Sequence, residues 1–537
     1  MQSKDDDMIT KKYYNNPIIP GFYPDPSICR VGEDYYLVNS SFEYFPAIPV
    51  WHSKDLVHWE QIGNAIDREE QGLNLDVNIS GGVQACTIRY HEGTFYITST
   101  CVGRVWPSLE YNFIITAKDP RGPWSEVHYI KDAPGIDSSL FFDDDGKAYY
   151  QGNRQTPGQP DLGVAELWIQ EINLETFELV GEKTVLWDGC MGQFPEGPHI
   201  YKRNGHYYLM IAEGGTGHWH TVTMAVADHI RGPYIASPRN PILSHKHLSK
   251  SYPIQNVGHA DLVETQNHQW YMVCLGVRPR GEFQEPSKDQ FMSEGGFYIN
   301  LGRETFLVPV KWEDDISPIV SPESGRVELM HQFPELEEKV FEKSPEESGF
   351  GEEKPGLQWN TIRDQKQKFI QFMGSNHIRM ELKQHNITED LDSGFYGRRQ
   401  TSWKYDAETE VELFSEKDAE AGMTCYFNYM SHIRIFVRKH ADQKEILLVR
   451  REGNQDKVLE KIKTNVARMA FKVEARDLIY TFYYKTNTCW QKIGKDVDGS
   501  HLNSTVGGGH TGSFVGVYGY APEKGQYAEF KNFSYTV

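Results

Sequence analysis

Hydrophobic and polar positions follow one repeated order through the first half of the chain. A polar residue is followed, about a dozen residues later, by a turn and a strand-like run rich in aromatic residues. The second aromatic of each run is Tyr36, Tyr96, Tyr150, Tyr208 and Tyr271, so the repeat length is 54 to 63 residues. A fixed period of this size is typical of radial or stacked repeats.

The pattern within each repeat predicts strands and turns rather than helices. Runs of β-branched and aromatic residues alternate with glycine-containing turns, and helical periodicity is weak. Three repeats continue with a similar segment, at 52–59, 116–124 and 225–234, which predicts an outer strand that turns into a loop. Blades of about four antiparallel strands around an axis form a propeller, so five repeats predict five blades. Residues 295–312 predict a last strand pair that closes the ring near the N-terminus.

The periodicity ends after the fifth repeat, and this predicts three regions. Residues 1–320 form the propeller, which is the candidate catalytic domain. Residues 321–355 are rich in Glu, Pro and Ser and are predicted to be a surface linker. Residues 356–537 contain strand-like runs without the 60-residue period, which predicts a β-sandwich.

Charge and cysteine content exclude several classes of protein. The net charge is −20, whereas binding to nucleic acid or to an anionic membrane requires a basic surface. There is no run of 18 apolar residues and no apolar segment of the signal-peptide kind at the start. The seven cysteines are scattered without a Cys-x-x-Cys pair. We therefore expect reduced thiols in a cytoplasmic protein.

Register decides where the chemically active residues fall. The first strand of each propeller blade lines the central channel, so the residue that opens each repeat is predicted to lie at one end of the axis. The five opening residues are Asp25, Gln84 or Ala85, Asp137, Glu196 and His259. Three carboxylates and an imidazole, far apart in the sequence, would therefore converge on one funnel.

Two carboxyl groups of opposite protonation are what hydrolysis of a glycosidic bond requires. Glu196 beside the negative charge of Asp137 would have a raised pKa and act as general acid, because a like charge disfavours ionisation. Asp25, nearer to water or to a cation, would stay ionised and act as general base. Inverting enzymes separate the two groups by roughly 6.5–9.5 Å, a span that suits opposite sides of a funnel.

Each of these residues also has a plainer explanation. Asp-Pro-Ser and Glu-Gly-Pro are common turn sequences when taken singly, and only their matched place in the repeats favours a shared site. His259 fits a core histidine, a substrate contact or a metal ligand. Four further aromatics fit either core packing or sugar stacking, namely Phe42, Trp106, Phe194 and Trp219.

Four motifs together resemble glycoside hydrolase family 43. They are residues 16–28 (NPIIPGFYPDPSI), 134–146 (PGIDSSLFFDDDG), 195–199 (PEGPH) and 301–305 (LGRET). Over nearly its whole length the chain is most similar to the two-domain β-xylosidases and α-L-arabinofuranosidases of that family. The resemblance implies an all-β fold, in which a five-bladed β-propeller is followed by a lectin-like (concanavalin A-like) β-sandwich, and an inverting reaction.

The resemblance also implies roles, residue by residue. Asp25 matches the general base, Glu196 the general acid, and Asp137 the residue that tunes the pKa of the acid and orients the substrate. The matching substrate-binding positions are Phe42, Thr216, His259 and Arg303. Arg303 would be the cation that keeps a neighbouring carboxylate ionised. No cofactor and no set of metal ligands is predicted; a calcium ion, which in some relatives lies near the equivalent of His259, would be structural.

Two departures from the family pattern bear on specificity. Gln84 stands in the second repeat where many such xylosidases carry a stacking tryptophan. Residues 507–510 (GGGH) stand where related sandwiches offer a phenylalanine loop over the pocket, so His510 would give that loop a polar tip.

We therefore expect an exo-acting glycosidase that releases terminal D-xylose, and also L-arabinose, from short oligosaccharides. The alternative within this class is an α-L-arabinofuranosidase. The alternative from a different class is a carbohydrate-binding propeller without chemistry. The resemblance is compatible with a homo-oligomer.

Overall fold

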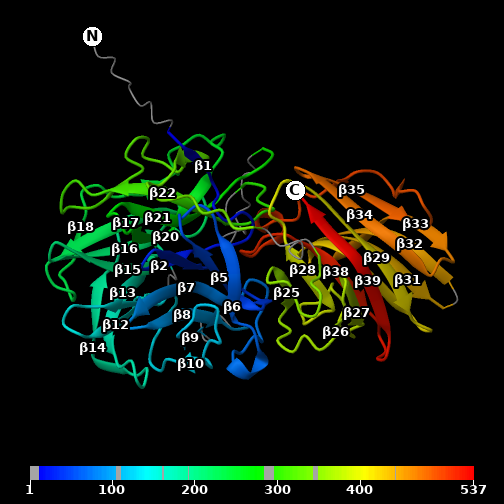
Figure 1. Ribbon diagram of the computed structural model, residues 1–537, viewed down its shortest axis with the longest axis horizontal. Coiled ribbons are helices and arrows are strands. Elements are labelled where there is room, and N and C mark those ends of the chain that lie inside the picture. The colour runs from blue at the N-terminus through cyan, green and yellow to red at the C-terminus, as the bar shows by residue number, and fades with distance from the viewer. Residues whose placement is uncertain are drawn as a thin grey trace, which may run out of the picture.

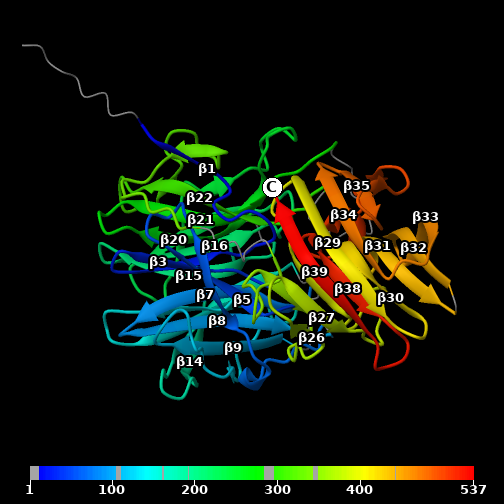
Figure 2. The ribbon, with the colours of Figure 1, turned by 45° about the vertical axis from the view of Figure 1, so that its right-hand side comes forward.

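The architecture is described from a computed structural model, over residues 11–104, 110–159, 163–190, 193–282, 296–342, 349–441 and 443–537. Within these ranges the protein is nearly all β-structure, with a short helix, α1 (Ser504–Gly507), and a 3-10 turn, η1 (Glu69–Gln71). No helix there is long and apolar enough to cross a membrane. Two bodies of strands lie side by side in Figure 1 and remain adjacent in the rotated view of Figure 2.

Five antiparallel sheets of the N-terminal body are the five blades of a propeller, as the repeat predicts. Blade by blade, the strands are β2 (Ser27–Val31), β3 (Asp34–Val38), β5 (Ala47–Ser53) and β6 (Glu60–Ile66); β7 (Gly82–His91), β8 (Thr94–Val102), β9 (Glu110–Ala117) and β10 (His128–Tyr129); β11 (Ser139–Phe142), β12 (Ala148–Gln155), β13 (Ala165–Ile172) and β14 (Leu179–Trp187); β15 (Glu196–Arg203), β16 (His206–Glu213), β17 (Thr221–Ala227), β18 (Ile235–Ala236) and β19 (Leu243–Ser244); β20 (Gln255–Glu264), β21 (Trp270–Val277), β22 (Glu304–Lys311) and β23 (Ile319–Val320).

The inner strands close the ring around the axis. β2, β7, β11, β15 and β20 contact one another in that order, and β20 returns to β2. The N-terminal segment is bound to the last blade, because Ile19 bridges Thr305. Next to it, β1 (Tyr13–Asn15) pairs with β24 (Met330–Gln332).

Two segments differ from the expected organisation. The described residues of the segment 295–312 supply one strand, β22, where a strand pair was predicted. The described residues before it, 296–303, run toward the sandwich, where Asn300 Nδ2 donates to the carbonyl of Gly499 at 2.9 Å. The predicted linker 321–355 contains β24, so part of it is bonded to the propeller.

Two packed sheets form the C-terminal body, the predicted β-sandwich. In order across the first sheet, the strands are β33 (Gln455–Thr464), β32 (Gln443–Glu452), β31 (Ser431–His440), β30 (Ala419–Asn428), β38 (Phe514–Tyr520), β28 (Phe395–Arg399), β25 (Trp359–Ile362) and β4 (Tyr44–Phe45). The second sheet holds β26 (Ile370–Phe372), β27 (His377–Glu381), β39 (Tyr527–Thr536), β29 (Lys404–Phe414), β34 (Arg468–Arg476), β35 (Ile479–Lys485), β36 (Gln491–Lys492) and β37 (Val497–Asp498).

The propeller and the sandwich share a sheet and a buried cluster. β4 belongs to loop 39–46 of the first blade, yet it pairs with β25 of the sandwich. Phe22 and Phe42 of the propeller are buried in one cluster with Phe395 and Phe514 of the sandwich. The loop that carries Phe42 is therefore held by both bodies.

Candidate active site

One end of the propeller collects the starts of the inner strands and the loops after the second strands. These strands are antiparallel within each blade, so the second strand ends where the first begins. Glu196 of β15, for example, is paired with Ala212 near the end of β16. Loops 39–46 and 214–220, with the described part of the β21–β22 connection, therefore surround the axis at this end. They carry Phe42, Thr216 and Arg303.

The inner strands share a backbone feature at one level. When the blades are aligned on the pairing of their first two strands, the equivalent residue in each has a φ in the left-handed region. These residues are Asp25 (51°), Ala85 (46°), Asp137 (57°), Gly197 (60°) and His259 (44°). β7, β15 and β20 also shift register at this level. Bulges re-aim side chains, and strained residues cluster at functional sites.

In the fourth blade, the residue predicted to lie at the level of Asp25 is wrong by one position. The equivalent of Asp25 there is Gly197; Glu196 lies one residue earlier, at the position that Gln84 occupies in the second blade. A Cβ at Gly197 would lie 3.1 Å from Cε1 of His259, so a larger residue would press on the imidazole. Glycine leaves room for the histidine, and the carboxyl group comes from the neighbouring position.

Asp25 is buried and ionised. Its Oδ1 accepts a hydrogen bond from Arg303 Nη1 at 3.1 Å, and its Oδ2 accepts one from Ser40 Oγ at 2.6 Å. Ser40 Oγ in turn accepts the backbone N–H of Ala85 at 2.7 Å, which directs its own hydrogen to Asp25. Burial alone would raise the pKa of Asp25. The charge of Arg303, together with His259 and Ser40, outweighs burial and leaves the pKa below its ordinary value.

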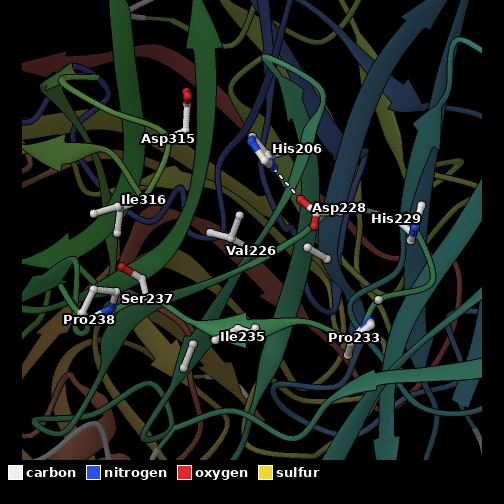
Figure 3. Close-up of a pocket in the computed structure, with 13 residues that line it drawn as sticks. His206, Val226, Asp228, His229, Pro233, Ile235, Ser237, Pro238, Asp315 and Ile316 are labelled. Carbon is white, nitrogen blue, oxygen red and sulfur yellow. Dashed lines mark hydrogen bonds and ion pairs between the residues drawn. The ribbon is translucent and has the colours of Figure 1, made fainter.

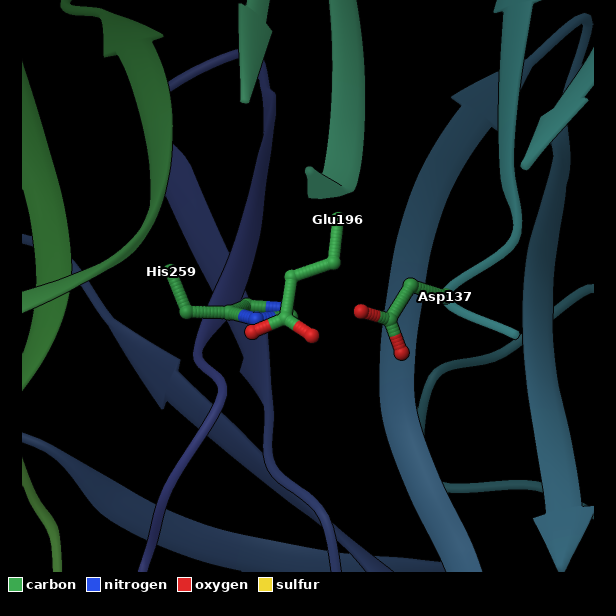
Figure 4. Close-up of side chains that lie close together, drawn as sticks. All are labelled: Asp137, Glu196 and His259. Carbon is green, nitrogen blue, oxygen red and sulfur yellow. The ribbon is translucent and has the colours of Figure 1, made fainter. Parts of the chain in front are cut away.

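The pKa of Glu196 is shifted in the opposite direction. Burial raises its pKa, and the negative charge of Asp137 raises it further, to about 8. One carboxylate oxygen from each residue and a ring nitrogen of His259 all lie within 4.8 Å of one another. Figure 4 shows the Glu196 carboxyl group between the imidazole and Asp137. Near neutral pH, Glu196 therefore holds a proton at the same axis where Asp25 is ionised.

The sandwich contributes to the surroundings of Asp25 through a backbone loop. Arg303 Nη1, which contacts Asp25, also donates to Thr216 Oγ1 at 3.0 Å, and Arg303 Nη2 donates to the carbonyl of His510 at 3.2 Å. The N–H of His510 donates to Ser80 Oγ of the propeller at 2.8 Å. The loop at 507–510 thus contacts the surroundings of Asp25 through main-chain atoms of His510, whereas the sequence had suggested a polar side-chain tip.

A second polar layer lies below the first and was missed from the sequence. Two residues after each left-handed position, every inner strand has a polar side chain: Ser27, Thr87, Ser139, His199 and Asp261. Asp261 pairs with Arg89 at 2.7 Å, and it accepts hydrogen bonds from Ser27 at 2.7 Å and from Tyr201 at 2.6 Å. Arg89 also contacts His199 Nδ1 at 2.9 Å. The period-two polar position in each repeat was the signal that could have revealed this layer.

Of the remaining candidate residues, Phe42 lies beside Arg303 and the others have separate surroundings. Phe42 is buried, with the Arg303 guanidinium 5.5 Å from its ring centre. Gln84 Nε2 donates to the carbonyl of Ser80 at 2.9 Å. Phe194 packs under loop 214–220, because a Cβ at Gly215 would lie 3.5 Å from its ring. Trp219 is 63% exposed, and Trp106 lies outside the described residues.

The cluster of Asp137, Glu196 and His259 supplies three candidate metal-ligand atoms. Calcium takes six to eight oxygen ligands, whereas this set holds two carboxylates and an imidazole nitrogen. By itself the set does not form a calcium shell, and we derive no reaction step through a metal.

A surface pocket of about 360 Å³ lies away from the axis, at the outer edge of the fourth blade. Figure 3 shows its lining from β17, β18 and the segment at Asp315 and Ile316, with His206 Nδ1 2.8 Å from Asp228. The lining contains none of the residues predicted to carry chemistry. The residues predicted to carry chemistry therefore lie at the axis and not in this pocket.

Comparison with known proteins matches both bodies. The family model for glycosyl hydrolases family 43 matches residues 14–318, and the model for the β-xylosidase C-terminal concanavalin A-like domain matches residues 347–536.

Relatives of similar length share the whole arrangement. A xylosidase/arabinosidase of Butyrivibrio fibrisolvens is 39% identical, over 94% of this chain and 95% of its own. A non-reducing end α-L-arabinofuranosidase of Bacteroides ovatus is 36% identical, over 95% of this chain and 92% of its own. The solved structure of a xylan β-1,4-xylosidase from Bacillus halodurans has a TM-score of 0.89 at 31% identity, and the match covers 98% of this chain and 100% of that one.

Proposed function

The chain belongs to glycosyl hydrolase family 43, and on that premise we propose that it is an exo-acting, inverting glycosidase that releases terminal D-xylose or L-arabinose from short oligosaccharides. One observation carries the proposal: two carboxyl groups at one axis have pKa values that are shifted in opposite directions. Asp25 beside Arg303 is ionised, while Glu196 beside Asp137 holds a proton near neutral pH. A non-catalytic binding propeller has no need of such a pair, so this alternative is not favoured.

In the proposed reaction the two groups act on opposite faces of the terminal sugar. Asp25 takes a proton from a water molecule as its oxygen attacks the anomeric carbon. Glu196 gives its proton to the glycosidic oxygen as that bond breaks. Asp137 keeps Glu196 protonated beforehand. The products are a sugar of inverted anomeric configuration and a shortened alcohol, and the protons balance once Asp25 passes its proton to solvent and Glu196 regains one.

The sugar would be held by the residues around these groups. Thr216 and Arg303 present polar atoms that already contact each other, and Phe42 supplies an apolar wall. His259 stands beside the acid. The sandwich loop beside these residues favours a site for one terminal sugar over a site for a polymer, which supports exo action. A location in the cytoplasm and a homo-oligomeric state stay predictions.

Initial rates on 4-nitrophenyl β-D-xylopyranoside and 4-nitrophenyl α-L-arabinofuranoside test the proposal. Activity on either, with a product of inverted configuration by NMR, would support it. A strong preference for the arabinofuranoside would favour the second candidate, which the names of the relatives support equally. Retention of configuration would contradict the assignment of Asp25 as a base that activates water.

A further inference from the structure

Trp219 is an exposed aromatic residue that the mechanism does not use. Trp219 is 63% exposed, more than any other large aromatic residue among the described residues. A partner that covers this side chain would gain free energy from burying its apolar surface. Its place in the fold indicates what kind of partner this is.

Loop 214–220, which carries Trp219, lies at the end of the propeller where Asp25 and Arg303 meet. The loop joins β16 to β17, whose ends are paired at Glu213 and Thr221. Within it, Thr216 contacts Arg303, which contacts Asp25. Trp219 is three residues after Thr216, so their Cα atoms are at most about 11 Å apart.

The backbone and ring of Trp219 are both supported. A Cβ at Gly214 would lie 2.2 Å from the carbonyl oxygen of Trp219, so the two ends of the loop touch and glycine is required there. The N–H of the buried His220 donates to the carbonyl of Gly217 at 3.1 Å. The His218 ring stands edge-on to the indole, with centroids 5.7 Å apart and planes at 69°. The loop is thus a small structured platform.

We propose that Trp219 forms a leaving-group subsite, on which the second sugar of the substrate stacks. This inference rests on the proposed exo-glycosidase function. The terminal sugar would bind among the residues at the axis, so the rest of an oligosaccharide must pass the loops at this end of the propeller, and the exposed indole belongs to one of these loops. Gln84, on the second blade, has its amide engaged with Ser80 and offers no aromatic face. The fourth blade therefore supplies the stacking surface in this chain.

The test compares two substrates that differ only in the leaving group, xylobiose and methyl β-D-xylopyranoside. For Trp219→Ala we expect kcat/KM on xylobiose to fall about 5- to 30-fold, mainly through KM, as for the loss of an aromatic stacking contact. The methyl glycoside has no second sugar, so its kcat/KM should stay within about twofold. Trp219→Phe should retain part of the xylobiose activity. Ile235→Ala, at an exposed apolar residue of β18, is the matched control and should change neither substrate.

Two results would overturn the subsite. Unchanged kcat/KM of Trp219→Ala on xylobiose would show that the indole does not contact the leaving sugar. Equal losses on both substrates would show that the loop supports the catalytic residues instead. If the wild-type enzyme accepts only arabinofuranosides, arabinobiose and methyl α-L-arabinofuranoside replace this pair. Wild-type inactivity on all four glycosides would instead overturn the proposed function.

Discussion

The propeller and the sandwich contribute to the same site in different ways. The propeller repeats one backbone bend five times, at Asp25, Ala85, Asp137, Gly197 and His259, and the groups at or beside these bends differ from blade to blade. The sandwich has no such repeat, and it reaches the site with one loop, through the backbone N–H and carbonyl of His510. Rotational repetition supplies chemical groups, whereas the sandwich holds Arg303 in place through main-chain atoms of one loop.

This difference predicts how each body responds to substitution. Side chains at the axis carry charge, so changing them alters rate and pH dependence directly. The sandwich acts on Arg303 through main-chain geometry, so substitutions there matter when they displace the loop. The shared strand β4 and the buried cluster around Phe42 connect the two effects.

Removing the general acid should have the largest effect. Glu196→Ala should slow hydrolysis of xylobiose roughly 100- to 10,000-fold, the usual size of acid catalysis, and slow 4-nitrophenyl glycosides much less because their leaving group needs little protonation. Asp25→Ala should slow both substrates alike. Steady-state kinetics on the two substrates measure the ratio, and equal losses for Glu196→Ala would contradict its role as the acid.

Neutralising Asp137 should move the pH profile. The negative charge of Asp137 raises the pKa of Glu196, so Asp137→Asn should lower that pKa from about 8. The alkaline limb of kcat/KM should then move to lower pH by about one unit. Asp143→Asn, in the same blade but paired with Lys202 away from the axis, is the control and should leave the limb in place. If the alkaline limb of Asp137→Asn does not move, the charge of Asp137 does not raise the pKa of Glu196.

Displacing the sandwich loop should have a smaller effect. A Cβ at Gly509 would lie 2.4 Å from Ser80 Oγ, whereas one at Gly508 would meet nothing within 4 Å. Both glycines have positive φ, 72° at Gly508 and 81° at Gly509, so both alanine variants carry backbone strain, and Gly509→Ala adds the clash. Gly509→Ala should lower kcat/KM by about 10-fold, through a misplaced Arg303. Its acid limb should also move to higher pH, because Asp25 loses part of its cationic neighbour.

Gly508→Ala controls for strain in this comparison. Similar kinetics for both variants would show that the contact between His510 and Arg303 has no part in positioning Asp25. Thermal unfolding of both proteins verifies that any loss of activity is not a loss of fold.

The smallest expected effect concerns stability at the boundary between the two bodies. Burial raises the pKa of Glu43 to about 7, against an ordinary 4.5, although the charge of Arg363 lowers it. The folded state therefore favours the protonated form, so this contribution to stability is complete below about pH 4.5 and is lost as pH rises through 7.

Glu43→Gln keeps an oxygen that can accept the N–H of Ser80, which Glu43 now does at 3.1 Å, and it cannot ionise. Its melting temperature should fall less than that of the wild type between pH 5 and pH 8. Glu33→Gln, at an exposed position between β2 and β3, should follow the wild type. Parallel curves for Glu43→Gln and wild type would mean that Glu43 is ionised in the folded protein throughout.

The repeat in the sequence determined much of this protein. Five aromatic runs at a regular period require five similar units, and only a closed ring brings Asp25, Asp137, Glu196 and His259 together. The motifs around these residues also identified the family. Such features are local or periodic, so they can be read before the chain is folded.

Tertiary structure decided what depends on contacts between distant segments. Glu196 lies one residue out of phase because Gly197 must leave space for His259, a neighbour from another blade. The pair of Arg89 and Asp261 joins the second and fifth blades, and Ser80 meets His510 across 430 positions. The opposite pKa shifts of Asp25 and Glu196 follow from such contacts and from burial, because a charge interacts with whatever the fold places beside it.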